Sequence, residues 1–172
     1  AWDEIFQSGI GSEKFKIGID IFPPPQIMGF LLHELIPLKI RAKHPKWTKD
    51  RSVSEKDLIY TPNLAHSMEI KTSSHPNKIF GNRSYAQPSK NPKKDKSGYY
   101  LAVNFEGFDK TKTRRPRILL IRFGWLDYTD WVGQVAPTGQ QAHLKTESEN
   151  SKLIELYKAS DDSTATLDVF RK

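Results

Sequence analysis

The stretch that organises the fold is residues 57–72, DLIYTPNLAHSMEIKT. It holds two short β-prone runs separated by Pro62 and Asn63, which favour a turn. We therefore expect an antiparallel hairpin that turns about Asn63, so that residues equally far from Asn63 along the chain face each other. In that register Asp57 lies opposite Glu69.

Side chains alternate along a strand, and this alternation sorts the hairpin into two faces. Glu69 and Lys71 share one face, with Asp57 beside them. A slip of one residue would reverse the arrangement, so the acidic face depends on the register. The alternative is an ordinary edge hairpin with a solvated face, and the pattern alone leaves both open. The apolar residues on the opposite face are Leu58, Met68 and Ile70.

Two acids and a lysine form the minimum set for hydrolysing a phosphodiester. The attack adds negative charge to an anionic phosphate, and a hard divalent cation held by carboxylates neutralises that charge and lowers the pKa of a bound water. A nearby lysine can orient the water and touch the phosphate. Asp57, Glu69 and Lys71 supply this combination. Because a D…ExK string is common by chance, its value here rests on the hairpin geometry.

A helix is expected from Gln26 to about His44, directly after the stiff Pro23-Pro24-Pro25 run. Its apolar residues recur at helical spacing and predict a largely buried helix, which Pro37 should kink or break. Glu34 falls on the same stripe, where a carboxylate needs a partner or a metal, so it is an optional metal ligand. The alternative is a glutamate at the edge of the stripe that reaches solvent. The stripe consists of Ile27, Phe30, Leu31, Leu35 and Leu38.

The segment 79–87, IFGNRSYAQ, follows this site closely and is a candidate for reading DNA bases. Asn and Gln can pair bidentately with adenine, and Arg with guanine, in the major groove. Basic loops near 88–97 and 109–117 could contact phosphates. Both the polar segment and the charge runs can equally be solvated surface loops. The residues expected to contact DNA are Lys78, Asn82, Arg83, Ser84, Tyr85, Gln87, Lys93 and Lys94.

The remaining elements place the hairpin within an α/β domain. Residues 99–105 and 118–123 are continuous apolar runs, typical of central strands covered on both faces. Residues 151–159 fit a short helix, whereas the pattern of 127–145 predicts no particular structure. We expect one domain over residues 1–172, with a mixed β-sheet flanked by helices. The five histidines show no zinc-ligand spacing, so none is expected to bind a metal.

Composition narrows the classes of function. The chain has 27 Lys and Arg against 20 Asp and Glu, a formal charge of +7, which favours a polyanionic partner. The absence of cysteine excludes disulfides, thiolate zinc sites and a cysteine nucleophile. The first 11 residues do not resemble a signal peptide, and no stretch approaches the roughly 20 apolar residues that span a bilayer. We expect a cytoplasmic protein with no membrane partner.

Several longer strings in the sequence are more specific than the D…ExK set. They are DIFPPP (20–25), LLHELIP (31–37), EKDL (55–58), EIKTS (69–73), IFGNRSY (79–85), GYYLAVNF (98–105) and RFGWLD (122–127). At these strings the chain resembles the ScaI-type restriction endonucleases, within the PD-(D/E)XK nuclease superfamily, and the likeness covers most of residues 17–144. One departure is that Lys56 stands before Asp57, where the superfamily motif is named for a proline.

This resemblance implies a type II restriction endonuclease with the restriction-endonuclease-like fold. It implies Mg²⁺-dependent cleavage of double-stranded DNA at a short symmetric sequence by a homodimer, with no small-molecule cofactor other than the metal. Asp57 and Glu69 would be metal ligands and Lys71 the catalytic lysine. A symmetric site calls for a symmetric protein, and the aromatic residues within 124–131 are candidates for its interface.

Two rival functions remain open at the level of sequence. A nicking or repair nuclease would use the same three residues on another DNA substrate. A non-catalytic DNA-binding protein would hold the D…ExK set as a structural ion cluster. Cleavage of plain plasmid DNA into discrete fragments separates restriction from both rivals.

Overall fold

The computed structural model describes residues 1–172 except 53–54, 90–95, 110–111, 113, 137 and 161–172. Within that part no helix is both long and apolar enough to cross a membrane. Its α-helices are α1 (Trp2–Gln7), α2 (Pro25–Lys43) and α3 (Thr146–Lys152). Its strands are β1 (Gly9–Ile10), β2 (Phe15–Lys16), β3 (Trp47–Lys49), β4 (Leu58–Tyr60), β5 (Met68–Ser73), β6 (Phe80–Asn82), β7 (Gly98–Phe105), β8 (Ile118–Leu126), β9 (Trp131–Gly133), β10 (Gln141–Leu144) and β11 (Leu153–Lys158).

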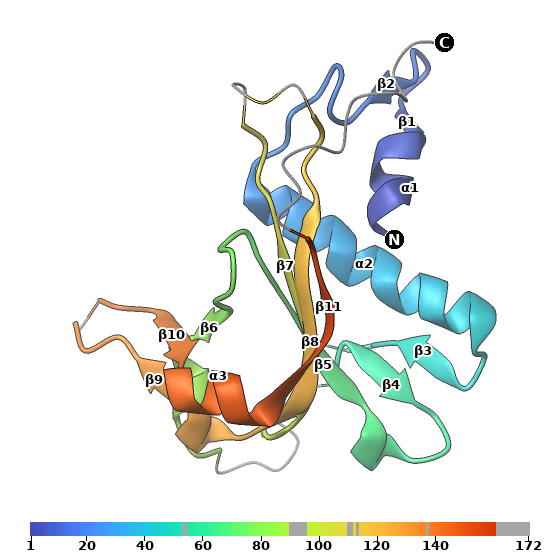
Figure 1. Ribbon diagram of the computed structural model, residues 1–172. Coiled ribbons are helices and arrows are strands. Elements are labelled where there is room, and N and C mark those ends of the chain that lie inside the picture. The colour runs from blue at the N-terminus through green and yellow to red at the C-terminus, as the bar shows by residue number, and fades with distance from the viewer. Residues whose placement is uncertain (53–54, 90–95, 110–111, 113, 137, 161–172) are drawn as a thin grey trace.

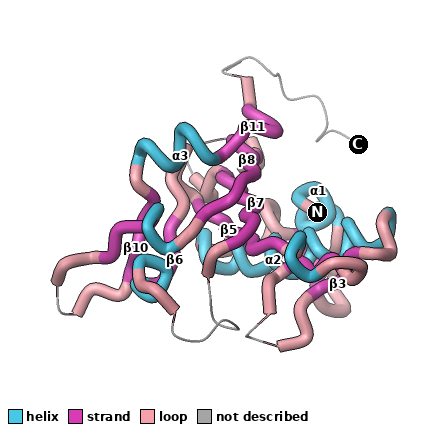
Figure 2. Tube along the Cα trace, turned by 90° about the horizontal axis from the view of Figure 1, so that it is seen from below, coloured by secondary structure: helices cyan, strands magenta, loops and turns pink. Residues whose placement is uncertain are grey.

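The central feature is a six-stranded mixed sheet in the order β11-β8-β7-β5-β4-β3. Strands β5 and β7 are parallel, and the other neighbours are antiparallel. A separate three-stranded sheet, β6-β10-β9, lies across from α2, with β5 and β7 between them in both views (Figures 1 and 2). The predicted fold class, a mixed sheet with flanking helices, is confirmed.

Two buried clusters lie on opposite faces of β7. Because side chains alternate along the strand, Tyr100 and Ala102 pack toward the small sheet, in a cluster that includes Trp131. Val103 and Phe105 pack instead toward the helical side. The prediction that 99–105 and 118–123 form central strands is confirmed, since β7 and β8 are both interior in the sheet.

The predicted hairpin register is also confirmed. Leu58 pairs with Met68, which is the register expected for a turn about Asn63. The Asn63 side chain accepts a hydrogen bond from the Ala65 amide and starts a 3-10 turn. The amide of Tyr60 donates to the hydroxyl of the residue preceding β5, at 3.0 Å. These contacts lock the loop and so hold the acidic face in place.

Helix α2 differs from the prediction in its buried face. Ile27, Phe30 and Leu38 are 48%, 59% and 48% exposed, whereas Met28 and Leu32 are buried. The helix packs on the sheet along a narrow line, where Gly29 lets it approach β5 so closely that a Cβ would lie 2.8 Å from the hydroxyl oxygen of the strand's threonine. The prediction of a largely buried helix was therefore wrong.

Pro37 neither breaks nor ends helix α2, which continues to Lys43. The ring removes one helical hydrogen bond, the one to the carbonyl of residue 33. The packing of α2 against β3 and β5 compensates for that loss. The break allowed by the sequence pattern is therefore not observed, because tertiary contacts outweigh a single missing bond.

The C-terminal region was also predicted wrongly. Residues 151–159 were expected to be helical, but α3 ends at Lys152 and β11 then pairs with β8. Gly124 permits this approach, since a Cβ there would lie 1.9 Å from the Lys152 carbonyl oxygen. The open edge of β8 thus overrides the local helical preference. The stretch 127–145, for which no structure was predicted, holds β9 and β10, and β3 forms just after α2, where no strand was predicted.

The basic residues after β7 are tied to an acid. Glu106 is 14% exposed and accepts hydrogen bonds from Arg114 Nη2 at 2.7 Å and from the Arg117 amide at 3.1 Å. Lys112 Nζ also lies 4.0 Å from Glu106. This loop follows the end of β7 that is remote from the 96–98 segment (Figure 1). The expected contact of this loop with DNA phosphates stays a prediction, and the pairing with Glu106 reduces the positive charge that the loop offers to a phosphate.

Replacing Glu106 with Gln should lower the free energy of unfolding by about 1.5–3 kcal/mol, the usual worth of hydrogen bonds to charged groups. The Arg114 hydrogen bond is the main cause that holds the pKa of Glu106 below its ordinary value. The stabilising effect of the Glu106 carboxylate is therefore complete above its pKa in the unfolded chain, about 4.3. It is lost as the pH falls through the lower pKa that Glu106 has in the folded protein. Urea unfolding at pH 7 and below pH 4 measures both effects.

The matched control is Glu13→Gln, because Glu13 is exposed and accepts a hydrogen bond from the hydroxyl of the neighbouring serine. That variant should unfold like the wild type at both pH values. If Glu106→Gln retained full stability at pH 7, the bidentate arginine pairing would have no structural role.

Candidate active site

Strand β5 carries the two central groups of the site. Glu69 is buried and Lys71 is half-buried, and their side chains share one face of the strand. Asp57 precedes β4, and its Oδ2 accepts a hydrogen bond from the Ile70 amide at 2.7 Å. The structure therefore brings the three predicted residues together. The hydrogen bond holds Asp57 beside β5, at the residue between Glu69 and Lys71.

Glu69 is surrounded by donors and cations. The Tyr85 hydroxyl donates to Oε1, and Lys71 Nζ lies 3.2 Å and Lys96 Nζ 3.7 Å from the same oxygen. Both lysine ammoniums also stand over the Tyr85 ring, at 4.6 Å and 5.1 Å. The hydrogen bond from Tyr85 and the two ammonium charges held over its ring favour the ionised form of the Glu69 carboxylate. Burial alone raises the pKa of Glu69, but the lysines and Tyr85 outweigh it and hold the pKa at about 2.

Tyr85 takes a different role from the expected one. It was predicted to contact DNA, but it is buried against Trp131 and Tyr100 in the core. Burial, with Glu69 close by, raises the pKa of Tyr85, so the phenol stays a neutral donor. Its function in the site is to fix the Glu69 carboxylate, and the DNA contact is withdrawn.

The two carboxylates suit a divalent cation. Burial raises the pKa of Asp57, and the charge of Glu69 raises it further. Mg²⁺ binds in proteins through one or two carboxylates together with waters and substrate phosphates, and this pair fits that donor set. Within the described ranges no three Asp, Glu, His or Cys side chains converge into a fuller metal cage. A cation at this pair would relieve the repulsion between the acids.

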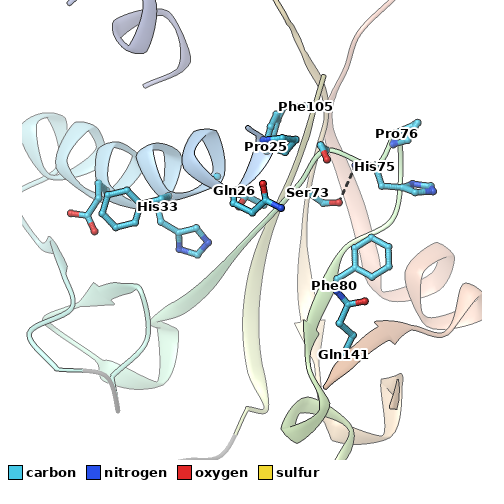
Figure 3. Close-up of a pocket in the computed structure, with 14 residues that line it drawn as sticks. Pro25, Gln26, His33, Ser73, His75, Pro76, Phe80, Phe105 and Gln141 are labelled. Atoms are coloured by element: carbon cyan, nitrogen blue, oxygen red, sulfur yellow. Dashed lines mark hydrogen bonds between the residues drawn. The ribbon is translucent and has the colours of Figure 1, made fainter. Parts of the chain in front are cut away.

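His33 was missed by sequence reasoning. It projects from α2 toward the sheet, and its Nδ1 lies 3.8 Å from Asp57 Oδ2 (Figure 3). Burial, only partly offset by Asp57, lowers the pKa of His33 and favours the neutral ring. The string LLHELIP contains His33. Its spacing from the other histidines gave no hint of a role in the site, because its partner Asp57 lies on another element.

Glu34 does not join the two acids. Its carboxylate accepts a hydrogen bond from Lys49 at 2.5 Å, and its side chain is about a third exposed. Lys49 belongs to β3, a strand that the sequence did not predict. The charge on the helix stripe is thus compensated by an ion pair, and we leave Glu34 out of the proposed metal site.

A groove runs beside this cluster, between α2 and the small sheet. One cavity of about 980 Å³ is lined by parts of α2, the segment 72–76, Phe80 and Gln141 (Figure 3). A second, of about 300 Å³, adjoins it, because His33, Thr72, Phe80 and Gln141 line both. Lys71 lines the second cavity, so one of the three catalytic candidates opens directly onto the groove.

The other predicted DNA contacts are distributed unevenly. Asn82 lines the smaller cavity, and Arg83 donates to the Ala136 carbonyl at 3.5 Å, which ties the turn after β6 to the loop between β9 and β10. Lys93 and Lys94 lie outside the described residues. The exposed residues that stay candidates are Lys78, Asn82, Ser84 and Gln87. Lys96 belongs to the basic loop near 88–97, and its ammonium lies beside Glu69.

Replacing Tyr85 with Phe should slow any reaction that depends on Glu69 by about 10- to 100-fold, since a hydrogen bond to a charged group is worth about 1.5–3 kcal/mol. The ring packing against Trp131 is kept, so the fold should persist. Single-turnover rates and thermal unfolding together separate the two effects. Tyr157→Phe on exposed β11 is the control and should change neither quantity. An unchanged rate in Tyr85→Phe would remove the hydroxyl from the site.

Comparison with known proteins places these features in one family. Residues 1–157 match the family described as ScaI restriction endonuclease. The chain is 51% identical over 159 residues to the type II restriction enzyme ScaI of Streptomyces caespitosus, an alignment that spans 91% of this chain and 69% of that protein. No solved structure matches the chain. The acid pair, its lysine and the match over residues 1–157 lead to one conclusion: the chain belongs to the ScaI restriction endonuclease family.

Proposed function

We propose that this protein is a type II restriction endonuclease that hydrolyses phosphodiester bonds in double-stranded DNA at a short symmetric sequence. The observation that carries the proposal is the convergence of Asp57, Glu69 and Lys71 beside a groove. Family membership supports the same activity. Type II restriction enzymes generally need a divalent metal, and we propose Mg²⁺ as that metal.

Asp57 and Glu69 would hold the metal. When bound, Mg²⁺ would neutralise charge on the phosphate and lower the pKa of water. The chain's own groups have complementary roles. Lys71 places a positive charge where the attacking water and the phosphate must meet, and Lys96 adds a second positive charge near the same carboxylate. Tyr85 keeps the Glu69 oxygen oriented without bringing charge of its own.

The groove explains how a duplex could reach these groups. It is bounded by α2 on one side and by the small sheet on the other, and β5 lies at its base (Figure 3). The net charge of +7 favours approach of DNA. A phosphate beside Lys71 would place the adjoining base edges toward Asn82 on β6.

Incubation of the purified full chain with plasmid DNA tests the proposal. Discrete double-strand fragments that appear with Mg²⁺ and disappear with EDTA are expected. Nicked circles alone would favour a nicking nuclease, and gel shifts that ignore Mg²⁺ without cleavage would favour a non-catalytic binding protein. Either outcome would overturn the proposal.

A homodimer is the assembly that fits a symmetric DNA site, because each subunit then presents one centre to one strand. The aromatic residues considered for the dimer interface differ in exposure. Trp125 and Tyr128 are 47% and 39% exposed, whereas Trp131 is buried and is removed from the set. Sedimentation without DNA should give the mass of two protein chains, and with DNA the mass of two chains plus the duplex. A monomer in both conditions would contradict this assignment.

A further inference from the structure

We propose that Gln141 of β10, side by side with Asn82 of β6, reads an adenine edge in the DNA major groove. This inference rests on the proposed function and deepens it, because it names a specificity residue outside the segment 79–87. The juxtaposition that carries it is a pair of carboxamides sharing one cavity with Lys71.

Strand register places the two carboxamides together. Gln141 pairs with Asn82 in the antiparallel ladder of β6 and β10. Residues directly opposite each other have side chains on the same face, about 4.5–5.5 Å apart at Cβ. The neighbouring pair, His143 and Phe80, falls on that face as well.

Burial identifies this face as the open one. Along β10 exposure alternates, so that Gln141 and His143 are exposed while Ala142 and Leu144 are buried. Gly81, opposite Ala142, faces the Tyr85 ring in the core. The face that bears the carboxamides therefore points away from the core.

The same face borders the groove. Gln141 lines both cavities, and in the smaller one it is joined by Asn82 and Lys71. Figure 3 shows Gln141 and Phe80 across from His33, with the groove between them. A duplex bound with a phosphate near Lys71 would present its base edges to this face.

The backbone of Gln141 is held firmly, which suits a recognition residue. Its amide donates to the Gln134 side chain at 3.3 Å, and its carbonyl accepts from the Gln134 amide at 2.9 Å. A fixed strand lowers the entropy lost when the side chain binds. Residues placed on regular strands are also positioned more accurately than residues on loops.

The chemistry of this face favours an A·T pair. A carboxamide donates and accepts at once, which matches N7 and the N6 amino group of adenine. Phe80, 39% exposed on the same face, offers an apolar contact of the kind that a thymine methyl group takes. The two carboxamides stand on adjacent strands of the three-stranded sheet β6-β10-β9, and some DNA-binding proteins read bases with sheet strands placed in a groove.

The test begins with the recognition sequence mapped from wild-type cleavage products. Duplexes carrying that sequence are then prepared with 7-deazaadenine at one adenine at a time, which removes the N7 acceptor. Binding is measured by fluorescence anisotropy in Ca²⁺ in place of Mg²⁺, with gel analysis to verify that the DNA stays intact. The proteins compared are the wild type, Gln141→Leu, Gln141→Glu and the control Gln140→Leu.

We expect one adenine at which the deaza substitution weakens wild-type binding by about tenfold, within the usual worth of a bidentate base contact. Gln141→Leu and Gln141→Glu should bind the unmodified duplex about tenfold more weakly and lose no more at the deaza position. Gln140→Leu should behave like the wild type, because residue 140 lines neither cavity. Binding to an unrelated duplex should be equal for all four proteins.

A wild type that cuts at a fixed sequence but is insensitive to every deaza substitution would overturn this inference alone. So would a recognition sequence without an A·T pair, or full deaza sensitivity in Gln141→Leu. A wild type that neither cuts nor prefers any sequence would overturn the proposed function as well. The two failures are therefore distinguishable.

Discussion

Replacement of Glu69 with Gln is expected to reduce DNA cleavage by about 10³-fold or more, because charge stabilisation by a bound metal is worth several kcal/mol. The substitution keeps the shape of the side chain and its hydrogen bond from Tyr85, but it removes the negative charge that a cation needs. Since the carboxylate is buried, no solvent-exposed acid can take its place. Single-turnover cleavage at saturating protein measures the effect.

DNA binding should respond in the opposite direction. Glu69 neutralises part of the charge of Lys71 and Lys96. Without that carboxylate both ammonium groups can attract phosphates more strongly, so metal-free affinity should be equal to or higher than that of the wild type. This combination of lost cleavage and retained binding distinguishes a catalytic acid from a residue needed for folding.

Glu34→Gln is the matched control for this experiment. Glu34 stands on the same side of the groove as His33, but its carboxylate is paired with Lys49. Cleavage by this variant should stay within about threefold of the wild type, since exposed ion pairs contribute about 1 kcal/mol or less. Full activity in Glu69→Gln would end the metal-site assignment, and a large loss in Glu34→Gln would show that a third acid takes part.

Local patterns were sufficient for the central strands and the hairpin. The run 99–105 is continuously apolar because β7 lies inside the sheet, with buried residues on both faces. The hairpin register followed from alternation and from Asn63, a residue suited to a turn. In both segments the information lies within a few residues, so sequence alone determines it.

Other elements depend on partners that are distant in sequence. Residues 153–158 become a strand because β8 offers an open edge, which no local pattern announces. The buried face of α2 is fixed by where Gly29 meets β5. Of the apolar stripe seen in the sequence, Ile27, Phe30 and Leu38 are exposed, whereas the two remaining leucines pack against the core. Tertiary pairing decided both cases against local preference.

The residues of the candidate site also fall into a group that local sequence predicts and a group that it does not. Asp57, Glu69 and Lys71 lie within one hairpin, so their meeting could be predicted from its register. Tyr85 and His33 reach the site from β6's neighbouring turn and from α2, and no spacing rule links them to β5. Long-range contacts of this kind appear only when the sheet is assembled.

Lys71→Met is the second variant expected to have a large effect, a loss of about 10²–10⁴-fold in the cleavage step, which is the range for a positioned proton-transfer or charge-stabilising group. Methionine keeps the apolar stem but removes the charge near Glu69. Lys96 cannot fully replace it, because its ammonium lies 3.7 Å from Glu69 Oε1, farther than the 3.2 Å of Lys71.

Lys96→Met provides the comparison that separates geometry from total charge. Both variants lose one positive charge near the same carboxylate, so a purely electrostatic role predicts similar losses. If Lys71 acts on the attacking water and the phosphate, its loss must exceed that of Lys96→Met by at least about tenfold under single-turnover conditions. Equal losses would mean that the two lysines only share the task of neutralising Glu69, and the assignment of Lys71 as the catalytic lysine would have to be abandoned.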